Sequence, residues 1–289
     1  MGGMRIDLHT HSTMSDGTDT PAELVAVAAA AGLDVIALTD HDTTAGWAGA
    51  IEALPAGLTL IPGAELSCVS TSDSGRPISV HLLAYLFDPA APALVAEQQR
   101  LRRERRDRLR AMAERMAADG LPIDADEVLG RLPADSPAGR PHLAQALVRA
   151  GLVATVDEAF AEYLSNGRGY YLSRQDTPVE TAIDMIADAG GVTVVAHPFA
   201  RSRGRVISAE NIAALAERGL AGVEVDHPNH DEATRAELRV LARELGLVQT
   251  GSSDYHGTNK TIPIGANTTD PEAFEALVAK ASGQPIAVG

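Results

Sequence analysis

Two short apolar runs near the N-terminus end in histidine and aspartate, and this feature constrains the fold most. Residues 4–8 lead into His9 and His11, and residues 35–39 lead into Asp40 and His41. Imidazole nitrogen and carboxylate oxygen both bind divalent transition metals, and the end of a strand holds such side chains rigidly beside its neighbours. The pattern predicts strands whose ends meet at a metal site.

Five further apolar runs continue the pattern, at residues 58–61, 79–85, 192–196, 222–225 and 247–250. Helix signals separate many of them: Thr20-Pro21 and Thr177-Pro178 predict helix starts, the latter as a capping box with Glu180, and Ser208 and Asp231 predict two more. Alternating strands and helices favour a largely parallel sheet. Seven strands favour an α/β fold with a distorted (β/α)7 barrel over an open sheet.

The window 93–174 breaks this alternation. An arginine-rich helical pattern at 97–118 is followed by three shorter ones near 124–132, 141–150 and 156–164, with no β-like run between them. We interpret the window as a small inserted helical domain, a lid on the substrate side of a barrel formed by residues 1–92 and 175–289. The seven arginines at 100–110 predict a solvated helix face, with attraction of a polyanion as the alternative.

Composition excludes several classes of protein. The single cysteine, Cys68, allows neither an internal disulfide nor a cysteine-based zinc cluster, so histidines and carboxylates must hold any metal. A net charge of −15 argues against a general nucleic-acid coat protein, although the window 93–174 has 13 Arg and 12 acidic residues and is thus locally basic. Without a signal-peptide pattern or an apolar run of membrane-spanning length, we expect a cytoplasmic protein.

Metal-binding residue types follow the ends of all the predicted strands. The candidate ligands are His9, His11, Asp16, His41, Glu65, His81, His197, Asp254 and His256. A lone histidine in a strand is more often a satisfied polar group than a ligand, but nine suitable residues at strand ends favour the catalytic face of a barrel. We expect Asp40, and also Asp42, to orient His41 through its second ring nitrogen. Asp7 receives no role.

The motifs at these positions resemble those of the PHP (polymerase and histidinol phosphatase) family of metal-dependent phosphoesterases. They are Asp7-Leu8-His9-Thr10-His11-Ser12, Ser15-Asp16-Gly17, Leu38-Thr39-Asp40-His41-Asp42, Pro62-Gly63-Ala64-Glu65, His81, Ala196-His197-Pro198 and Ser253-Asp254-Tyr255-His256. Within the family, the sequence is similar to the TrpH-like branch of 3′,5′-nucleotide bisphosphate phosphatases. Gly139-Arg140-Pro141-His142 and Ser165-Asn166-Gly167-Arg168-Gly169-Tyr170 resemble the inserted domain of that branch.

The resemblance implies two to three divalent ions, and the residue types suit Mn²⁺, Fe²⁺ or Zn²⁺. His9, His11, Glu65 and Asp254 would hold the first ion, Glu65, His81 and His197 the second, and Asp16, His41 and His256 the third. Glu65, His197 and Asp254 are thereby the expected catalytic residues. A hydroxide shared between two metals would attack the phosphorus, because metal coordination lowers the pKa of water toward neutrality.

Arginines outside the ligand set are candidates for anchoring the substrate. Arg140, Arg168 and Arg201 can grip phosphate with a bidentate guanidinium, and His142 can assist; surface ion pairing is the alternative for the arginines. Asp226 and His227 are weak candidates for the acid that protonates the leaving group. His227 and His230, like His142, fall outside the ligand pattern.

Three functions remain open at this point. The leading one is hydrolysis of a small nucleotide, such as a 3′,5′-bisphosphonucleotide, or 5′-3′ trimming of short RNA, as the resemblance implies. The second is a phosphatase for histidinol phosphate or another small molecule, which does not explain the insert. The third is a metal-binding regulatory module without turnover, against which the complete ligand set argues. We expect a phosphorylated substrate and no membrane partner; the oligomeric state is left open.

Overall fold

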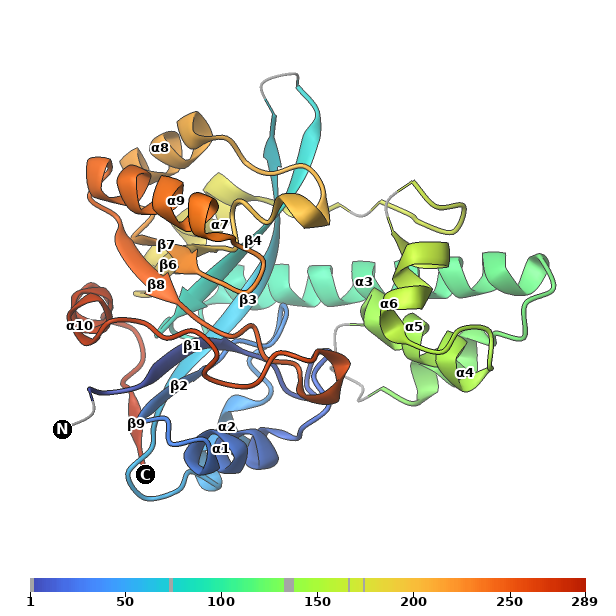
Figure 1. Cartoon of the computed structure of the whole chain (residues 1–289), viewed down its shortest axis with the longest axis horizontal. Helices are drawn as coiled ribbons and strands as arrows, with labels where there is room; N and C mark the ends of the chain where they lie inside the picture. The colour runs from blue at the N-terminus through green and yellow to red at the C-terminus, as the bar shows by residue number, and fades with distance from the viewer. Residues whose placement is uncertain (1–2, 73–74, 133–137, 166, 174) are drawn as a thin grey trace.

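The computed structural model describes residues 3–72, 75–132, 138–165, 167–173 and 175–289. Figure 1 shows a barrel-like body that carries both termini and a separate helical lobe joined to it by one long helix. The predicted α/β barrel fold is confirmed. Within the described residues, no helix combines the length and the apolar character needed to cross a membrane.

Seven strands form the wall of the barrel. In spatial order they are β1 (Ile6–Thr10), β2 (Val35–Leu38), β3 (Thr59–Thr71), β4 (Pro77–Tyr85), β6 (Val192–Ala196), β7 (Gly222–Asp226) and β8 (Val248–Gly251). The two-residue strands β5 (Thr177–Pro178) and β9 (Ala287–Val288) pair with β3. Beyond β8, Tyr255 forms a parallel bridge with Thr10 at the end of β1, so the last strand returns to the first.

The direction of β4 differs from the expected largely parallel sheet. β4 runs antiparallel to both β3 and β6. The reason is the short connection between β3 and β4, where Ser72 donates its backbone N–H to the Arg76 carbonyl. A parallel neighbour would need a crossover of about a dozen residues, and the chain provides none here. Both strands of this hairpin are also longer than the apolar runs predict.

Helices cover the outside of the barrel. They are α1 (Pro21–Ala30), α2 (Trp47–Glu52), α7 (Val179–Asp188), α8 (Ala209–Glu217), α9 (Glu232–Glu244) and α10 (Pro271–Val278), with 3₁₀ turns at Arg201–Arg203 and Gly257–Asn259. The predicted caps Thr20, Ser208 and Asp231 each accept a backbone N–H of the first turn. The capping box predicted at Thr177 is wrong, because Thr177 pairs with Cys68 of β3 and its hydroxyl donates to Glu97.

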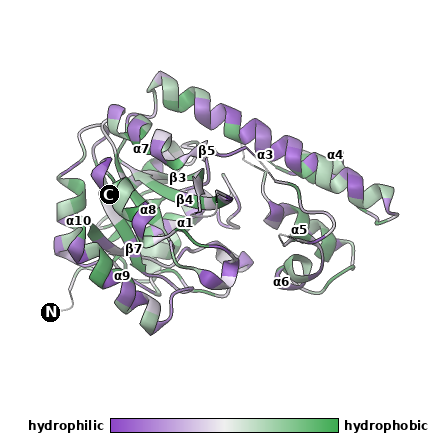
Figure 2. Ribbon diagram, turned by 90° about the horizontal axis from the view of Figure 1, so that it is seen from above, coloured by the Kyte–Doolittle hydropathy of each residue, from purple (hydrophilic) through white to green (hydrophobic). Residues whose placement is uncertain are grey.

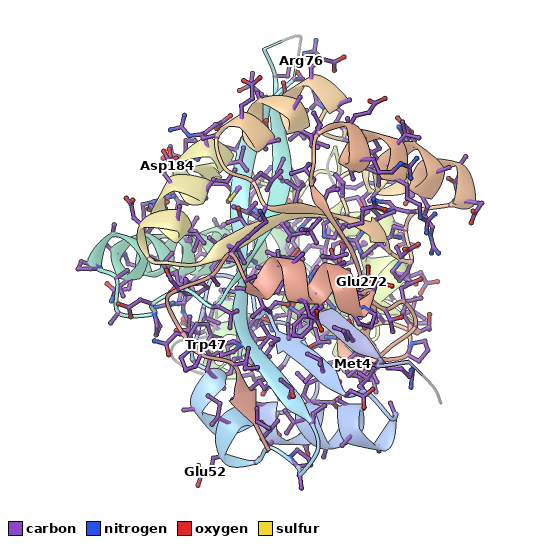
Figure 3. The ribbon with its side chains drawn as sticks, turned by 90° about the vertical axis from the view of Figure 1, so that its left-hand side faces the viewer. Met4, Trp47, Glu52, Arg76, Asp184 and Glu272 are labelled. Atoms are coloured by element: carbon purple, nitrogen blue, oxygen red, sulfur yellow. The ribbon has the colours of Figure 1, made fainter. Side chains whose placement is uncertain are left out.

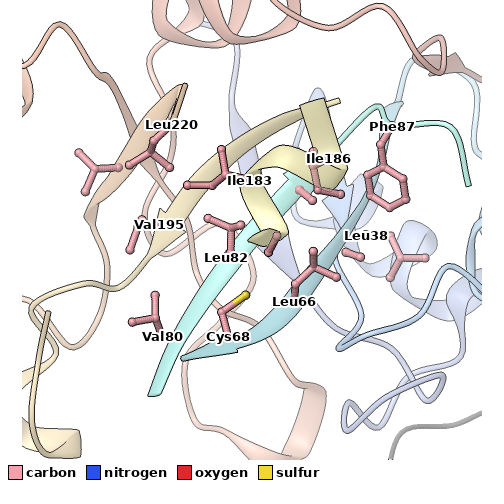
Figure 4. Packing of buried hydrophobic residues seen from close by; sticks show 14 of the residues in the cluster. Leu38, Leu66, Cys68, Val80, Leu82, Phe87, Ile183, Ile186, Val195 and Leu220 are labelled. Carbon is pink, nitrogen blue, oxygen red and sulfur yellow. The ribbon is translucent and has the colours of Figure 1, made fainter. Parts of the chain in front are cut away.

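Aliphatic side chains from both faces of the sheet form the core. Figure 4 shows the layer between the sheet and α7, where Ile183 and Ile186 lie against Leu66, Leu82 and Val195. A second cluster fills the barrel itself and includes Ile6, Leu8, Ala37, Leu83 and Val194. Charged side chains project outward, as Glu52, Asp184 and Glu272 do in Figure 3. The polar cluster described below is therefore an exception within an aliphatic interior.

The described part of the inserted segment consists of helices joined by turns and irregular segments. It contains α3 (Pro92–Ala118), α4 (Ala125–Gly130), α5 (Arg140–Arg149) and α6 (Val156–Ala159), followed by one π turn at Phe160–Leu164. Its own hydrophobic cluster includes Leu109, Met112, Met116, Leu143 and Leu147. Figure 2 shows α3 as a long helix of alternating hydrophilic and hydrophobic residues, and the hydrophobic residues of its far half belong to one cluster with residues of α4 and α5. The near end of α3 packs on the barrel through Leu94.

Several arginines of α3 donate hydrogen bonds to backbone carbonyls of neighbouring segments, so α3 does not present a face of unpaired cations to solvent. Arg100, Arg108 and Arg115 donate to the carbonyls of Gln175, Leu172 and Gly169, which lie along the returning chain. Arg106 similarly reaches the carbonyl of Leu129. These guanidinium groups donate to backbone oxygens of neighbouring segments and so hold α3 against the rest of the insert.

Candidate metal centre

The histidines of the chain converge at one end of the barrel. Eight of the nine form one connected series of ring contacts, with centroids 4.1–6.4 Å apart; these are His9, His11, His41, His81, His197, His227, His230 and His256. All nine predicted ligands lie in or beside this series, where three groups of ligand atoms are close enough to share an ion. The strand-end pattern thus identified residues that meet in space.

The first group has four atoms directed at one point. His9 Nε2 and His11 Nε2 lie 3.0 Å apart, and each lies 3.1 Å from Glu65 Oε2. Asp254 Oδ1 is 3.4 Å from the first nitrogen and 3.6 Å from the second. Four ligands placed tetrahedrally about 2.0–2.2 Å from an ion are about 3.3–3.6 Å from each other, so the observed spacing is close to that of a ligand shell.

Glu65 divides its two oxygens between two sets of histidines. Oε2 faces His9, His11 and His41, whereas Oε1 lies 2.7 Å from His81 Nδ1 and 3.3 Å from His197 Nε2. Burial opposes ionisation of this carboxyl, but the surrounding histidines outweigh burial and hold its pKa well below its ordinary value. Glu65 is therefore an anionic carboxylate positioned between two ligand groups.

The third group surrounds Asp16. Its Oδ1 is 3.2 Å from His256 Nε2, and its Oδ2 is 3.8 Å from His41 Nε2. His256 Nδ1 donates to the Asp254 carbonyl at 2.8 Å, which fixes the ring with Nε2 directed at Asp16. His11 also borders this group through its other ring nitrogen, 3.8 Å from Asp16.

Two features of this cluster fit metal binding specifically. The facing nitrogens of His9 and His11 satisfy each other only if one of them carries a proton, whereas both can donate lone pairs to a cation. The buried Nδ1 of His41 lies 3.2 Å from Glu65 but makes no hydrogen bond. A buried polar atom without a hydrogen bond lowers the stability of the folded state unless an ion or a water molecule contacts it. The donor set, imidazoles and carboxylates without thiolate, suits Mn²⁺, Fe²⁺ or Zn²⁺.

Two of the ligands do not occupy strand ends. Glu65 lies near the middle of the long β3, and His81 lies in the middle of the antiparallel β4. They face the cluster because their strands extend past the ends of the neighbouring parallel strands. The expectation that every candidate ligand follows the carboxyl end of a strand is thus wrong for these two positions, although their side chains do meet in the cluster.

Glu224 is a buried residue of the site that the motifs did not reveal. Its Oε1 lies 3.2 Å from His9 Nδ1, and its Oε2 accepts the His197 backbone N–H at 2.7 Å. This second contact supports His197 in the left-handed region, at φ 31°. Burial and the nearby charge of Arg203 lower the pKa of His197 to about 3, so its ring is neutral. The position of Glu224 within the apolar run 222–225, which became β7, was the available sequence signal.

Asp7, to which the sequence assigned nothing, also supports the site. Its carboxylate is buried and accepts the Ser253 N–H at 3.1 Å, the Ser253 hydroxyl at 2.6 Å and the Gly265 N–H at 2.8 Å. These bonds hold the segment that carries Asp254. Asp254 itself has a left-handed backbone, with φ 53°, which requires such support.

The expected role of Asp40 and Asp42 needs correction. Asp40 accepts the Ser12 N–H at 2.8 Å and the hydroxyls of Ser12 and Ser15 at 2.6 Å, so it braces the loop between His11 and Asp16 rather than orienting His41. Three donors already occupy that carboxylate. Asp42 likewise has other partners, described next.

Asp42 joins the barrel to the inserted domain. It accepts from the buried Arg105 of α3 at 2.5 Å and from the Ser67 N–H at 2.7 Å. Arg105 is 6% exposed and Asp42 fully buried, so neither charge has a substitute partner in water. The beginning of the insert is thereby fixed beside His41.

The second contact of the insert reaches the Asp16 loop. His142 accepts the Gly139 N–H at 3.0 Å and also hydrogen-bonds with the Ser15 backbone. Gln145 donates to Asn259 at 2.8 Å, and Asn259 donates to the Asp16 carbonyl at 2.7 Å. Of the predicted substrate residues, His142 thus lies beside the cluster.

The arginines predicted to bind the substrate are not part of the cluster of candidate metal ligands. Arg140 donates to the Leu164 carbonyl and lies over the rings of Phe160 and Tyr171. Arg201 pairs with Glu237 at 2.9 Å, and Arg168 is exposed. Asn166, from the same motif as Arg168, lies outside the described residues.

The two weak acid candidates differ in their environment. Asp226 accepts from Arg239 at 2.5 Å on the outer side of β7. His227 is fully buried, and its Nε2 lies 3.4 Å from Asp254 Oδ2.

Comparison with known proteins agrees with this geometry. The PHP domain family matches residues 7–123. A 3′,5′-nucleoside bisphosphate phosphatase of Chromobacterium violaceum is 34% identical over 252 residues, 87% of each chain. A 5′-3′ exoribonuclease of Haemophilus influenzae is 33% identical over 264 residues, 91% of this chain and 94% of that protein. A solved structure of a Bifidobacterium adolescentis metal-dependent phosphoesterase superposes with a TM-score of 0.89 at 35% identity, covering 97% of this chain and 98% of that one.

Proposed function

This chain belongs to the PHP domain family of metal-dependent phosphoesterases, and from that membership we propose that it hydrolyses the phosphate ester on the 3′ oxygen of a 5′-phosphorylated nucleotide. The observation that carries the proposal is the position of Glu65 between two groups of histidines. A carboxylate in that position can bridge two cations, which is the arrangement used for in-line displacement at phosphorus.

The proposed ligand sets are those implied by the family resemblance. His9, His11, Glu65 and Asp254 would hold one ion, Glu65, His81 and His197 a second, and Asp16, His41 and His256 a third. The spacing of the first and third sets and the two-sided contacts of Glu65 support this assignment. When bound, divalent ions lower the pKa of water and neutralise charge on phosphate oxygens.

The protein's own contribution is to hold these ligands rigid. Glu224 contacts the ring of His9 and accepts the backbone N–H of His197, and Asp7 holds the segment before Asp254. Such outer partners set the orientation and basicity of ligands, and their loss costs about 10–100-fold in metal affinity or activity. Hydrolysis forms a bond from water oxygen to phosphorus and breaks the bond from phosphorus to the 3′ oxygen, which takes up a proton.

The two kinds of relative act on a shared chemical group. A 5′-3′ exoribonuclease cuts after the first nucleotide, at a phosphorus attached to that nucleotide's 3′ oxygen. A 3′,5′-bisphosphonucleotide presents a phosphorus at the same position. Both substrates therefore place a 5′-phosphate and a 3′-linked phosphorus on one ribose, so one site can accommodate both a small bisphosphonucleotide and the 5′ end of short RNA.

We also propose that the inserted domain, residues 93–174, is a lid on the substrate side of the barrel. Two contacts support this role. Arg105 joins α3 to Asp42 beside His41, and Gln145 of α5 reaches the Asp16 loop through Asn259. Substrate that enters the cluster must then pass between the barrel and α5.

A phosphate-release assay across substrates tests the function. With Mn²⁺ added, we expect the protein to release phosphate from adenosine 3′,5′-bisphosphate and to shorten a 5′-phosphorylated oligoribonucleotide from its 5′ end. Histidinol phosphate is the control substrate of the alternative function. Equal or faster turnover of histidinol phosphate would refute the substrate assignment. No turnover of any phosphate ester by metal-loaded protein would favour a non-catalytic regulatory module.

A further inference from the structure

Two cationic side chains meet on the outer oxygen of Asp254. Lys260, just after the Gly257–Asn259 turn, places Nζ 2.6 Å from Asp254 Oδ2. Arg203, the last residue of the Arg201–Arg203 turn, places Nη2 3.0 Å from the same oxygen. The motifs identified neither residue. Lys260 is one of only two lysines in the chain.

Asp254 separates these cations from the metal ligands. Its Oδ1 faces inward, 3.4–3.6 Å from nitrogens of His9, His11 and His256. Its Oδ2 contacts Lys260 and Arg203 on one side and lies 3.4 Å from Nε2 of the buried His227 on the other. The two cations consequently lie next to the proposed metal site without belonging to a ligand group.

The pair is accessible, whereas the carboxylate that it contacts is not. The side chains of Lys260 and Arg203 are 29% and 39% exposed, against 4% for Asp254. An ammonium has three donors and a guanidinium five, and in the described part of the chain the Arg203 side chain makes its one hydrogen bond to Asp254. Both side chains therefore have further donors that a solvent-borne group can reach beside the ligand groups.

We propose that Arg203 and Lys260 bind the 5′-phosphate of the substrate while its 3′-linked phosphorus occupies the metal centre. This inference rests on the proposed function. It explains, through these two residues, why the protein would prefer a nucleotide with both a 5′-phosphate and a 3′-linked phosphate over one without the 5′-phosphate. Arg and Lys suit a phosphate dianion because charge-assisted hydrogen bonds to it are short and strong.

The test compares two substrates that differ only in the 5′-phosphate. The kcat/KM of Arg203→Met and Lys260→Met is measured on adenosine 3′,5′-bisphosphate and on adenosine 3′-monophosphate. Each substitution is expected to lower the value on the bisphosphate by about 10- to 100-fold, because one charge-assisted contact is lost. The value on the monophosphate is expected to change by less than about threefold, and bound metal to stay constant. Arg205→Met and Lys280→Met, at exposed positions, are the matched controls.

A binding measurement keeps the test independent of turnover. Calorimetric titration of the Mn²⁺-loaded protein with adenosine 5′-monophosphate should show about 10- to 100-fold weaker binding in each variant, with adenosine as the ligand that lacks the phosphate. Equal losses on both substrates, or lost metal, would show that the pair only orients Asp254 and would overturn the inference. Unchanged nucleotide binding would overturn it as well. If the wild type binds the nucleotide through this pair but hydrolyses neither substrate, the proposed function fails and this inference stands.

Discussion

Glu65→Gln is expected to reduce phosphate release by at least about 1,000-fold, because each bridging metal contributes several kcal/mol to the transition state. The amide keeps the size of the side chain but removes the charge that faces five histidines: His9, His11, His41, His81 and His197. A neutral group cannot bridge two cations effectively. Metal content per protein, measured by elemental analysis, should fall together with kcat.

The matched control is Glu272→Gln, an exposed glutamate in the first turn of α10. Its kcat and metal content should equal those of the wild type. Circular dichroism should show an unchanged fold in both variants. A Glu65→Gln protein that keeps its metals and turns over within about tenfold of the wild type would disprove the bridging role.

Removal of metal by a chelator is expected to abolish turnover and to lower the melting temperature. An ion present at 100 times its Kd stabilises the folded state by about 2.7 kcal/mol, which corresponds to roughly 4–5 °C for a chain of this size. Adding Mn²⁺ should restore both properties. Calorimetric melting with and without chelator measures the stability, and phosphate release measures the activity.

The recovery of activity on adding Mn²⁺ should also depend on pH, and should need more Mn²⁺ at lower pH. Burial opposes protonation of His9, but Glu65, Asp254 and Glu224 outweigh burial and raise its pKa well above the ordinary value. In the metal-free protein at neutral pH, the His9 ring is therefore a charged imidazolium with a proton on both nitrogens. A metal ion that binds to one nitrogen must displace its proton. The Mn²⁺ concentration needed for half-activity is expected to rise as the pH falls. Activity that survives exhaustive chelation would contradict this account.

The residues of the candidate metal centre were predictable because their residue types are rare and their positions regular. His9, His11 and His41 follow strands whose ends are visible as apolar runs, and eight of nine histidines do meet. Asp254 and His256 arrive more than 200 residues later, and the sequence placed them through the repetition of strands alone. The barrel itself followed from the same repetition.

The supporting residues were not predictable in this way. Glu224, Asp7 and Asp42 act through hydrogen bonds to partners distant in sequence, such as His197, Ser253 and Arg105. Nothing in local periodicity specifies which carboxylate meets which donor. The direction of β4 was missed for a related reason, because hydrophobic periodicity gives the position of a strand but not its orientation. The short connection near Ser72 was the informative signal there.

The central claim is that Glu65 bridges two metal ions at the end of the barrel. Anomalous diffraction from crystals soaked in Mn²⁺ tests it most directly. The account predicts one peak within about 2.0–2.2 Å of Glu65 Oε2, His9 and His11, and a second within the same distance of Oε1, His81 and His197. Metal-soaked crystals that lack a peak on either side of Glu65, in a protein that still releases phosphate, would contradict it.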